Sequence, residues 1–243
     1  MMLAVARDGA RVEARPGERA MCPGCGGDVI AKCGEINIWH WAHEADADCD
    51  TWHEAESAWH REWKRAAAPE QCEVDFGQHR ADIVGKHGTV IELQHSPISV
   101  EEIREREAFY SPLSPHGMIW LFDAAPWTHR LDLIGFDHAD SGPCMSFDWA
   151  QARPSHRHLK QTVFWDLGSL FDDMRQSAVA VERDTLKWLW FGDNQDRTIL
   201  RVENFWHYGG WGILFKRSEF IDSHIRPAIP APPVSHPRQG ALL

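Results

Sequence analysis

The chain has 243 residues, of which 43% are hydrophobic, and a formal net charge of −11. This length is enough for one large domain or two small ones, and the hydrophobic content is that of a globular protein, which excludes wholesale disorder. The acidic balance disfavours tight nonspecific binding to DNA by bulk charge, so any contact with nucleic acid needs a local basic patch or bound metal ions.

The sequence shows no sign of a membrane or secretory segment. No apolar run approaches the roughly 20 residues of a membrane span, and the first residues lack the apolar core of a signal peptide. We therefore expect a cytoplasmic protein with no membrane partner. In that compartment the six cysteines should bind metal or stay as free thiols instead of forming disulfides.

Residues 1–50 combine short strands with a run of metal-ligand residue types. Thiolates and imidazoles at short spacing are what a structural Zn²⁺ site requires. Short strands predicted at residues 29–30 and 36–38 would form a ribbon too small to fold on its own core, so the metal would supply the folding energy. The run comprises Cys22, Cys25, His40, His43 and Cys49.

The favoured zinc ligands are Cys22, Cys25, His43 and Cys49, and His40 is the substitute if Cys49 is not used. Reduced thiols without a metal are the alternative interpretation. The three cysteines that are not expected to bind zinc are Cys33, Cys72 and Cys144.

A helix is predicted over residues 54–67. Glu56, His60 and Lys64 are spaced four residues apart and therefore share one face of it. Taken alone, the pattern favours a helix face that is exposed to solvent.

The next segment places carboxylates on neighbouring strands. The predicted strands are residues 73–76, 80–84 and 89–94. Side chains alternate along a strand, so Glu92 and Gln94 share a face. Asp82 lies between apolar neighbours, where a carboxylate is costly unless it is exposed, paired or bound to a metal. Adjacent strands would bring Asp82 and Glu92 together, and oxygen ligands of this kind suit Mg²⁺ or Mn²⁺.

A second helix is predicted to begin after Ser99, which forms an S-x-x-E capping box with Glu102. It is followed by a buried strand at residues 116–122, so the order strand, helix, strand indicates an α/β fold with a parallel pair covered by a helix.

The sequence after residue 123 is less specific. Residues 205–212 favour a hairpin turn, with a base-stacking platform as the alternative. Basic residues at 153–160 would suit a phosphate backbone or a solvated loop. The 13 tryptophans are expected mainly to pack cores. A short helix is predicted over residues 218–225.

These pieces together resemble the competence protein CoiA-like family. The resemblance rests on CPGCGGDVIAKCG, HWAH, ESAWHREWK, RADIV, VIELQHSPIS, REAFY and MIWLF, which occur in that order over about half of the chain. It implies a restriction-endonuclease-like, PD-(D/E)XK α/β core with an N-terminal zinc ribbon and a C-terminal mixed extension. The expected parts are strands and zinc ribbon at 1–50, nuclease-like core at 51–123, tryptophan-rich α+β extension at 124–224 and Pro-rich disordered tail at 225–243.

The resemblance also implies a metal-dependent nuclease. Its nuclease motif falls on Asp82, Glu92 and Gln94, and its helical positions fall on Glu56 and His60. Asp82 and Glu92 would hold Mg²⁺ or Mn²⁺. Gln94 stands where the superfamily usually has a lysine, and it can orient water but carries no charge.

The expected partner is DNA, as single strands or processed ends, together with competence, recombination or phage proteins. The alternative is a DNA-binding or recombination-accessory protein that keeps the nuclease fold without catalysis; Gln94 and the acidic net charge favour it. A zinc-ribbon interaction module with no role on nucleic acid is a third, weaker interpretation.

Overall fold

In the computed structural model, the described residues are 1–35, 38–44, 49, 52, 54, 56–138, 141–149, 153–169, 180–181 and 197–226. They fall into two compact units, Met1–Gly88 and Thr89–Arg226. The division lies inside the segment that the resemblance assigns to one nuclease-like core, and each unit is described by itself. No helix in the described part of the chain is both long and apolar enough to cross a bilayer.

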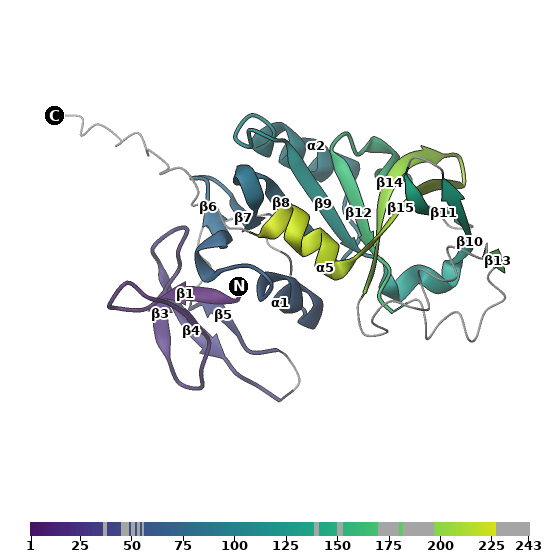
Figure 1. Cartoon of the computed structure of the whole chain (residues 1–243). Helices are drawn as coiled ribbons and strands as arrows, with labels where there is room; N and C mark the ends of the chain where they lie inside the picture. The colour runs from purple at the N-terminus through teal and green to yellow at the C-terminus, as the bar shows by residue number, and fades with distance from the viewer. Residues whose placement is uncertain are drawn as a thin grey trace. The chain divides into compact units, whose positions relative to one another are not determined.

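The first unit begins with a small antiparallel sheet whose order is β2-β1-β3-β4-β5 (Figure 1). Its core is correspondingly small and includes Val29 and Trp41, whose indole N–H donates to the carbonyl of Val12 at 2.9 Å. The strands are β1 Leu3–Val5, β2 Arg11–Glu13, β3 Arg19–Met21, β4 Asp28–Lys32 and β5 His40–His43.

The ribbon predicted around residues 29–30 is present, but its second strand was misplaced. The partner of β4 is β5, with Val29 opposite His43 and Lys32 opposite His40. The described residue Ile38 precedes that strand, whereas Ile36 lies outside the described residues. The shift matters because the observed register directs His43 to the same end of the ribbon as the β3–β4 turn.

A helix and a hairpin complete the described part of the first unit. Helix α1 spans Ala58–Lys64, later and shorter than the predicted 54–67, because Ser57 caps it: its hydroxyl accepts from the His60 N–H at 3.3 Å. Strands β6 (Cys72–Asp75) and β7 (Arg80–Val84) pair antiparallel between the 3₁₀ turns η1 (Pro69–Gln71) and η2 (Lys86–Gly88).

The second unit is built on one mixed sheet with the order β13-β10-β11-β15-β14-β12-β9-β8. Its parallel pairs are β8–β9, β9–β12 and β10–β13, and the other neighbours are antiparallel. The strands are β8 Val90–Gln94, β9 Met118–Asp123, β10 Leu131–His138, β11 Gly142–Trp149, β12 Thr162–Asp166, β13 Ala180–Val181, β14 Thr198–Trp206 and β15 Gly209–Lys216.

The predicted strand–helix–strand segment is confirmed. Helix α2 (Val100–Tyr110) connects the parallel strands β8 and β9, and the Ser99 hydroxyl caps it by accepting from the Glu102 N–H at 3.0 Å. The remaining helical elements are η3 Ala125–Arg130, η4 Pro154–His158, α5 Arg217–Phe220 and the π-helical turn Ile221–Ile225. The tail predicted to be disordered lies outside the described residues beyond Arg226.

Tryptophans make up much of the core of the second unit, as the composition suggested. Trp127 stacks on Trp149 with ring centroids 4.7 Å apart, and Trp165 meets both rings edge-on. His156 is enclosed by these rings and by Phe205, and burial lowers its pKa to about 3, with the charge of Arg153 adding to the effect. His156 is therefore a neutral core residue.

The β14–β15 hairpin explains the glycines near its turn. A Cβ on Gly209, Gly210 or Gly212 would lie 2.1–2.2 Å from a backbone carbonyl oxygen of a neighbouring strand. Only glycine permits such a close approach of backbones. The hairpin predicted for residues 205–212 is thus confirmed, and its composition reflects tight packing of β11, β15 and β14.

Gly212→Ala should therefore destabilise the protein by about 1–3 kcal/mol, as an overpacked core does. Urea unfolding followed by tryptophan fluorescence measures the change. The matched control is Gly34→Ala, because a Cβ at Gly34 meets nothing within 4 Å and its backbone is not left-handed. Equal unfolding midpoints for the two variants would contradict the packing argument.

Candidate metal centre and buried acidic site

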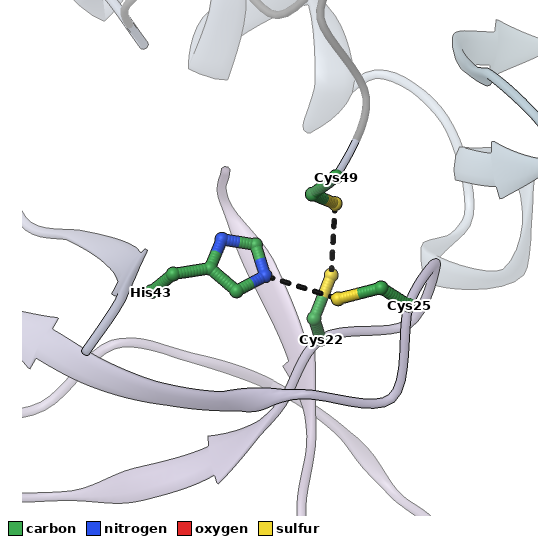
Figure 2. A group of neighbouring side chains, drawn as sticks. All are labelled: Cys22, Cys25, His43 and Cys49. Carbon is green, nitrogen blue, oxygen red and sulfur yellow. Dashed lines mark hydrogen bonds between the residues drawn. The ribbon is translucent and has the colours of Figure 1, made fainter. Parts of the chain in front are cut away.

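Four ligand side chains converge at one end of the small sheet. Cys22 and Cys25 come from the turn between β3 and β4, His43 is the last residue of β5, and Cys49 follows it. The turn is closed by two backbone hydrogen bonds, Cys22 N–H to Gly27 O at 2.8 Å and Gly26 N–H to Cys22 O at 3.0 Å. Figure 2 shows the four side chains pointing toward one another.

The spacing of these ligand atoms fits a tetrahedral metal. Cys22 Sγ lies 3.8 Å from Cys49 Sγ, Cys25 Sγ lies 3.2 Å from His43 Nε2, and all four ligand atoms lie within 4.8 Å of one another. A tetrahedron with bonds of about 2.3 Å has edges of about 3.8 Å, which is the geometry of structural zinc. The group could therefore hold a structural metal such as zinc.

The substitute ligand considered from the sequence is not part of this group. His40 Nδ1 lies 2.7 Å from the carbonyl oxygen of Ile38. The remaining cysteines also lie outside it. Cys72 Sγ donates to the carbonyl of Lys64, and burial raises the pKa of its thiol to about 12. Cys144 is buried and donates to the carbonyl of Gly142.

The guanidinium group of Arg80 lies beside the cysteine side chains of this group. Arg80 Nη1 lies 3.8 Å from Cys22 Sγ. Burial raises the pKa of the Cys22 thiol, but the N–H groups of Cys25 and Gly24 and the charge of Arg80 outweigh burial, so the net pKa is lowered. Three thiolates and one Zn²⁺ carry a net charge of −1, which the guanidinium offsets.

The second feature of this unit is a buried lysine surrounded by carboxylates. The Lys64 ammonium, at the end of α1, lies 3.1 Å from Glu56 Oε2, 3.2 Å from Glu73 Oε1 and 3.1 Å from Asp82 Oδ1. Burial lowers the pKa of Lys64, but the three carboxylates outweigh burial and hold it well above its ordinary value. Lys64 is therefore charged, and we call these four residues the Lys64 centre.

Glu73 is the member of this centre that the sequence analysis missed. Its carboxylate accepts the backbone N–H groups of Met2 and Leu3, each at 2.8 Å. Burial raises its pKa, but Lys64, Arg80 and the neighbouring N–H groups bring it down to about 2. Its φ of 51° is unusual for a glutamate and has no signal in the sequence.

The helix-face residues are buried, so the solvated-surface interpretation was wrong. The side chains of Glu56, His60 and Lys64 are 3–4% exposed. Glu56 precedes α1 instead of lying on it, and its buried Oε1 makes no hydrogen bond to any described residue. Asp82, on β7, is 23% exposed and is the member of the centre that reaches solvent.

His60 lies beside the Lys64 centre. Its Nε2 is 3.2 Å from Glu54, and its ring nitrogen Nδ1 is 2.8 Å from the Ser57 hydroxyl. Burial lowers the pKa of His60, but the hydrogen bond to Glu54 and the charge of Asp82 outweigh burial and raise it. A histidine placed this way can exchange a proton near neutral pH.

The other predicted catalytic residues belong to the second unit. Glu92 and Gln94 are buried two residues apart on β8. Glu92 Oε2 pairs with Arg106 Nη1 at 2.9 Å, and Gln94 Nε2 donates to the carbonyl of Ser96 at 2.9 Å. Arg106, which also contacts Glu102 at 2.5 Å, is a partner that sequence reasoning did not find.

Asp82 and Glu92 therefore lie in different units, and a metal shared between them stays a prediction. Across the described residues, the Cys₃His group is the one set of three or more His, Cys, Asp or Glu ligand atoms close enough together to hold an ion. The carboxylates of the Lys64 centre have the ammonium between them instead.

Comparison with known proteins finds a family match for the N-terminal segment. Residues 10–51, which include all four ligands, match the family described as competence protein CoiA, N-terminal domain. The chain is thus CoiA-like over this segment, as the motifs predicted. The match does not extend to the nuclease-like segment. No curated protein and no solved structure matches the chain.

Purified protein should contain one equivalent of zinc per chain. Cys22→Ser should lose the metal and make the N-terminal segment more sensitive to protease, because metal binding and folding are coupled in so small a ribbon. Elemental analysis and limited proteolysis measure the two effects. Cys33→Ser is the matched control and should keep its zinc; loss of metal in that variant would show that the ligand set is wrong.

Lys64→Met should lower the free energy of unfolding at pH 7 by about 3–5 kcal/mol, since it leaves buried carboxylates facing each other. The depressed pKa of Glu73 contributes stability that is complete above its ordinary 4.5 and is lost as the pH falls through about 2. The curves of wild type and variant should therefore converge toward low pH.

Urea titrations across this pH range test the prediction. The control is Arg65→Met, which removes the neighbouring cation, 60% exposed and paired with Glu13, and should change stability by less than about 1 kcal/mol. An Arg65 variant as unstable as the Lys64 variant would contradict the argument.

Proposed function

We propose that this protein processes DNA as a metal-dependent phosphodiester hydrolase in competence or recombination. The observation that carries the proposal is the Lys64 centre, where Glu56 and Asp82 meet beside His60. A buried carboxylate oxygen that makes no hydrogen bond to a described residue, Glu56 Oε1, fits a cation ligand. The CoiA-like N-terminal segment supports the competence-related role.

The charge of the centre also fits a divalent ion. Three carboxylates and one ammonium sum to −2, and carboxylate oxygens are the ligands that Mg²⁺ and Mn²⁺ prefer. Asp82 and Glu92 would hold the metal, with Glu56 as a further oxygen ligand. Such a metal would lower the pKa of bound water and offset charge on the scissile phosphate.

The protein's own residues would supply the remaining steps. Gln94 would orient the attacking water through its amide. The pKa of His60 is raised, because the hydrogen bond to Glu54 and the charge of Asp82 outweigh burial. His60 would donate or accept a proton, or contact the phosphate. Gln94 carries no positive charge, but the Lys64 ammonium lies 3.1 Å from Asp82 and would supply one.

The second candidate is a DNA-binding accessory protein without catalysis. The observation that favours it is that each predicted metal ligand already pairs with a buried cation: Glu56 and Asp82 with Lys64, and Glu92 with Arg106. Buried ion pairs of this kind also occur as purely structural features. Both candidate functions involve binding to DNA, and they differ in whether a phosphodiester bond is broken.

Asp82→Asn should abolish Mg²⁺-dependent cleavage of single- or double-stranded DNA while leaving the fold intact, because the amide keeps a hydrogen bond to Lys64 but is a poor metal ligand. Cleavage assays with Mg²⁺, Mn²⁺ and EDTA measure this. The control is Glu101→Gln, an exposed acid on α2, which should cleave like the wild type.

Gln94 separates the two candidates in the same assay. In an enzyme, Gln94→Ala should reduce the rate on the order of 10²-fold, and Gln94→Lys should retain or raise it. In a binding protein, no variant cleaves, and Gln94→Lys only tightens DNA binding and steepens its salt dependence. Cleavage that is indifferent to Asp82 and Gln94 alike would place the activity elsewhere.

A further inference from the structure

The tip of the β14–β15 hairpin exposes two aromatic rings. Trp206 ends β14 and is 45% exposed, and Tyr208 lies in the turn and is 60% exposed. Most other described tryptophans are buried, so Trp206 does not serve the core as they do. Two exposed aromatic rings one residue apart in the chain offer flat apolar faces on which a ligand ring can stack.

The tip is held in place by its neighbours. Trp206 and Gly209 are the last pair of the hairpin, so His207 and Tyr208 form a two-residue turn. The Trp149 N–H donates to the carbonyl of Tyr208 at 2.5 Å, and Arg157 Nη2 donates to the carbonyl of His207. A turn held at both residues presents its rings with little loss of conformational entropy on binding.

Cationic side chains gather at the same end of the sheet. Arg157, in η4, is exposed beside the turn, and exposed Lys160 follows it in the chain. Arg130 precedes Leu131, which pairs with Trp149 at this end. The guanidinium carbon of Arg153 lies 5.0 Å from the centroid of the Trp127 ring, which stacks on Trp149.

Acidic side chains lie at this end as well. Asp148 pairs with Gly209 across the sheet, and Asp132 lies opposite Asp148 on β10. Glu203, on β14, pairs with Arg201, and the buried Glu107 accepts the N–H of Lys160. Arg157 is the cation that contacts the turn itself, so it would meet a phosphate beside the two rings.

We propose that this hairpin tip binds single-stranded DNA. Bases stack on Trp206 and Tyr208, and Arg157 with its neighbours contacts the phosphates. A single strand fits better than a duplex because only unpaired bases expose their faces to a protruding ring. The inference deepens the proposed function and rests on it for the choice of DNA as the polyanion.

Fluorescence anisotropy with zinc-loaded full-length protein and labelled oligothymidylate, in buffer without Mg²⁺ or Mn²⁺, tests the proposal without cleavage. Trp206→Ala and Tyr208→Ala should each weaken binding about 5- to 100-fold, whereas Trp206→Phe and Tyr208→Phe, which keep an aromatic face, should bind like the wild type. Arg157→Gln should lower the slope of log affinity against log salt by about 0.7. The matched control is Trp39→Ala, a tryptophan 43% exposed in the first unit, which should not change affinity.

Three results would overturn the inference: alanine variants that bind like the wild type, phenylalanine variants as weak as the alanine ones, or tighter binding to vesicles of phosphatidylglycerol than to the oligonucleotide. Binding that depends on Trp206 and Tyr208 in a protein that never cleaves supports the hairpin site and overturns the nuclease proposal alone. Cleavage with binding that ignores both rings overturns the hairpin site alone.

Discussion

The first unit depends on keeping one ammonium group charged inside the protein. Removing an ammonium ion from water is unfavourable by several kcal/mol, and the carboxylates around Lys64 must offset this. They come from three segments: Glu56 before α1, Glu73 on β6 and Asp82 on β7. Glu73 extends the connection to β1 through Met2 and Leu3. One charge thus joins a helix, a hairpin and the start of strand β1 in the small sheet.

The small sheet itself has few apolar side chains to hold it together. Half of the residues in its buried cluster are alanines, and Val29 and Trp41 are the larger members. A core of this size contributes little hydrophobic stabilisation. The Lys64 centre therefore acts as an ionic cross-link where apolar burial is insufficient, and a metal held by the Cys₃His group would add a coordinate cross-link. The second unit is organised differently, because stacked tryptophans fill its interior.

How well the sequence predicted each feature depended on how local that feature is. The zinc-type ligands were found because a Cys-x-x-Cys turn and nearby histidines lie within one short segment. The spacing of His60 and Lys64 predicted a shared face but not its burial, which depends on Glu73 and Asp82 arriving from later strands. The Arg106 partner of Glu92 depends on how α2 packs on β8, which no spacing reveals. Tight backbone packing at Gly209 likewise involves strands far apart in the chain.

Strand β7 links the two sites of the first unit in a way that bears on how the protein can evolve. Arg80 and Asp82 are two residues apart and so project from one face of the strand, the former to Cys22 and the latter to Lys64. An insertion or deletion of one residue in the β6–β7 hairpin would turn both side chains to the opposite face together. Natural variation at the thiolate cluster and at the acidic centre is therefore not independent. Insertions and deletions in this hairpin are tolerated only where they keep both contacts.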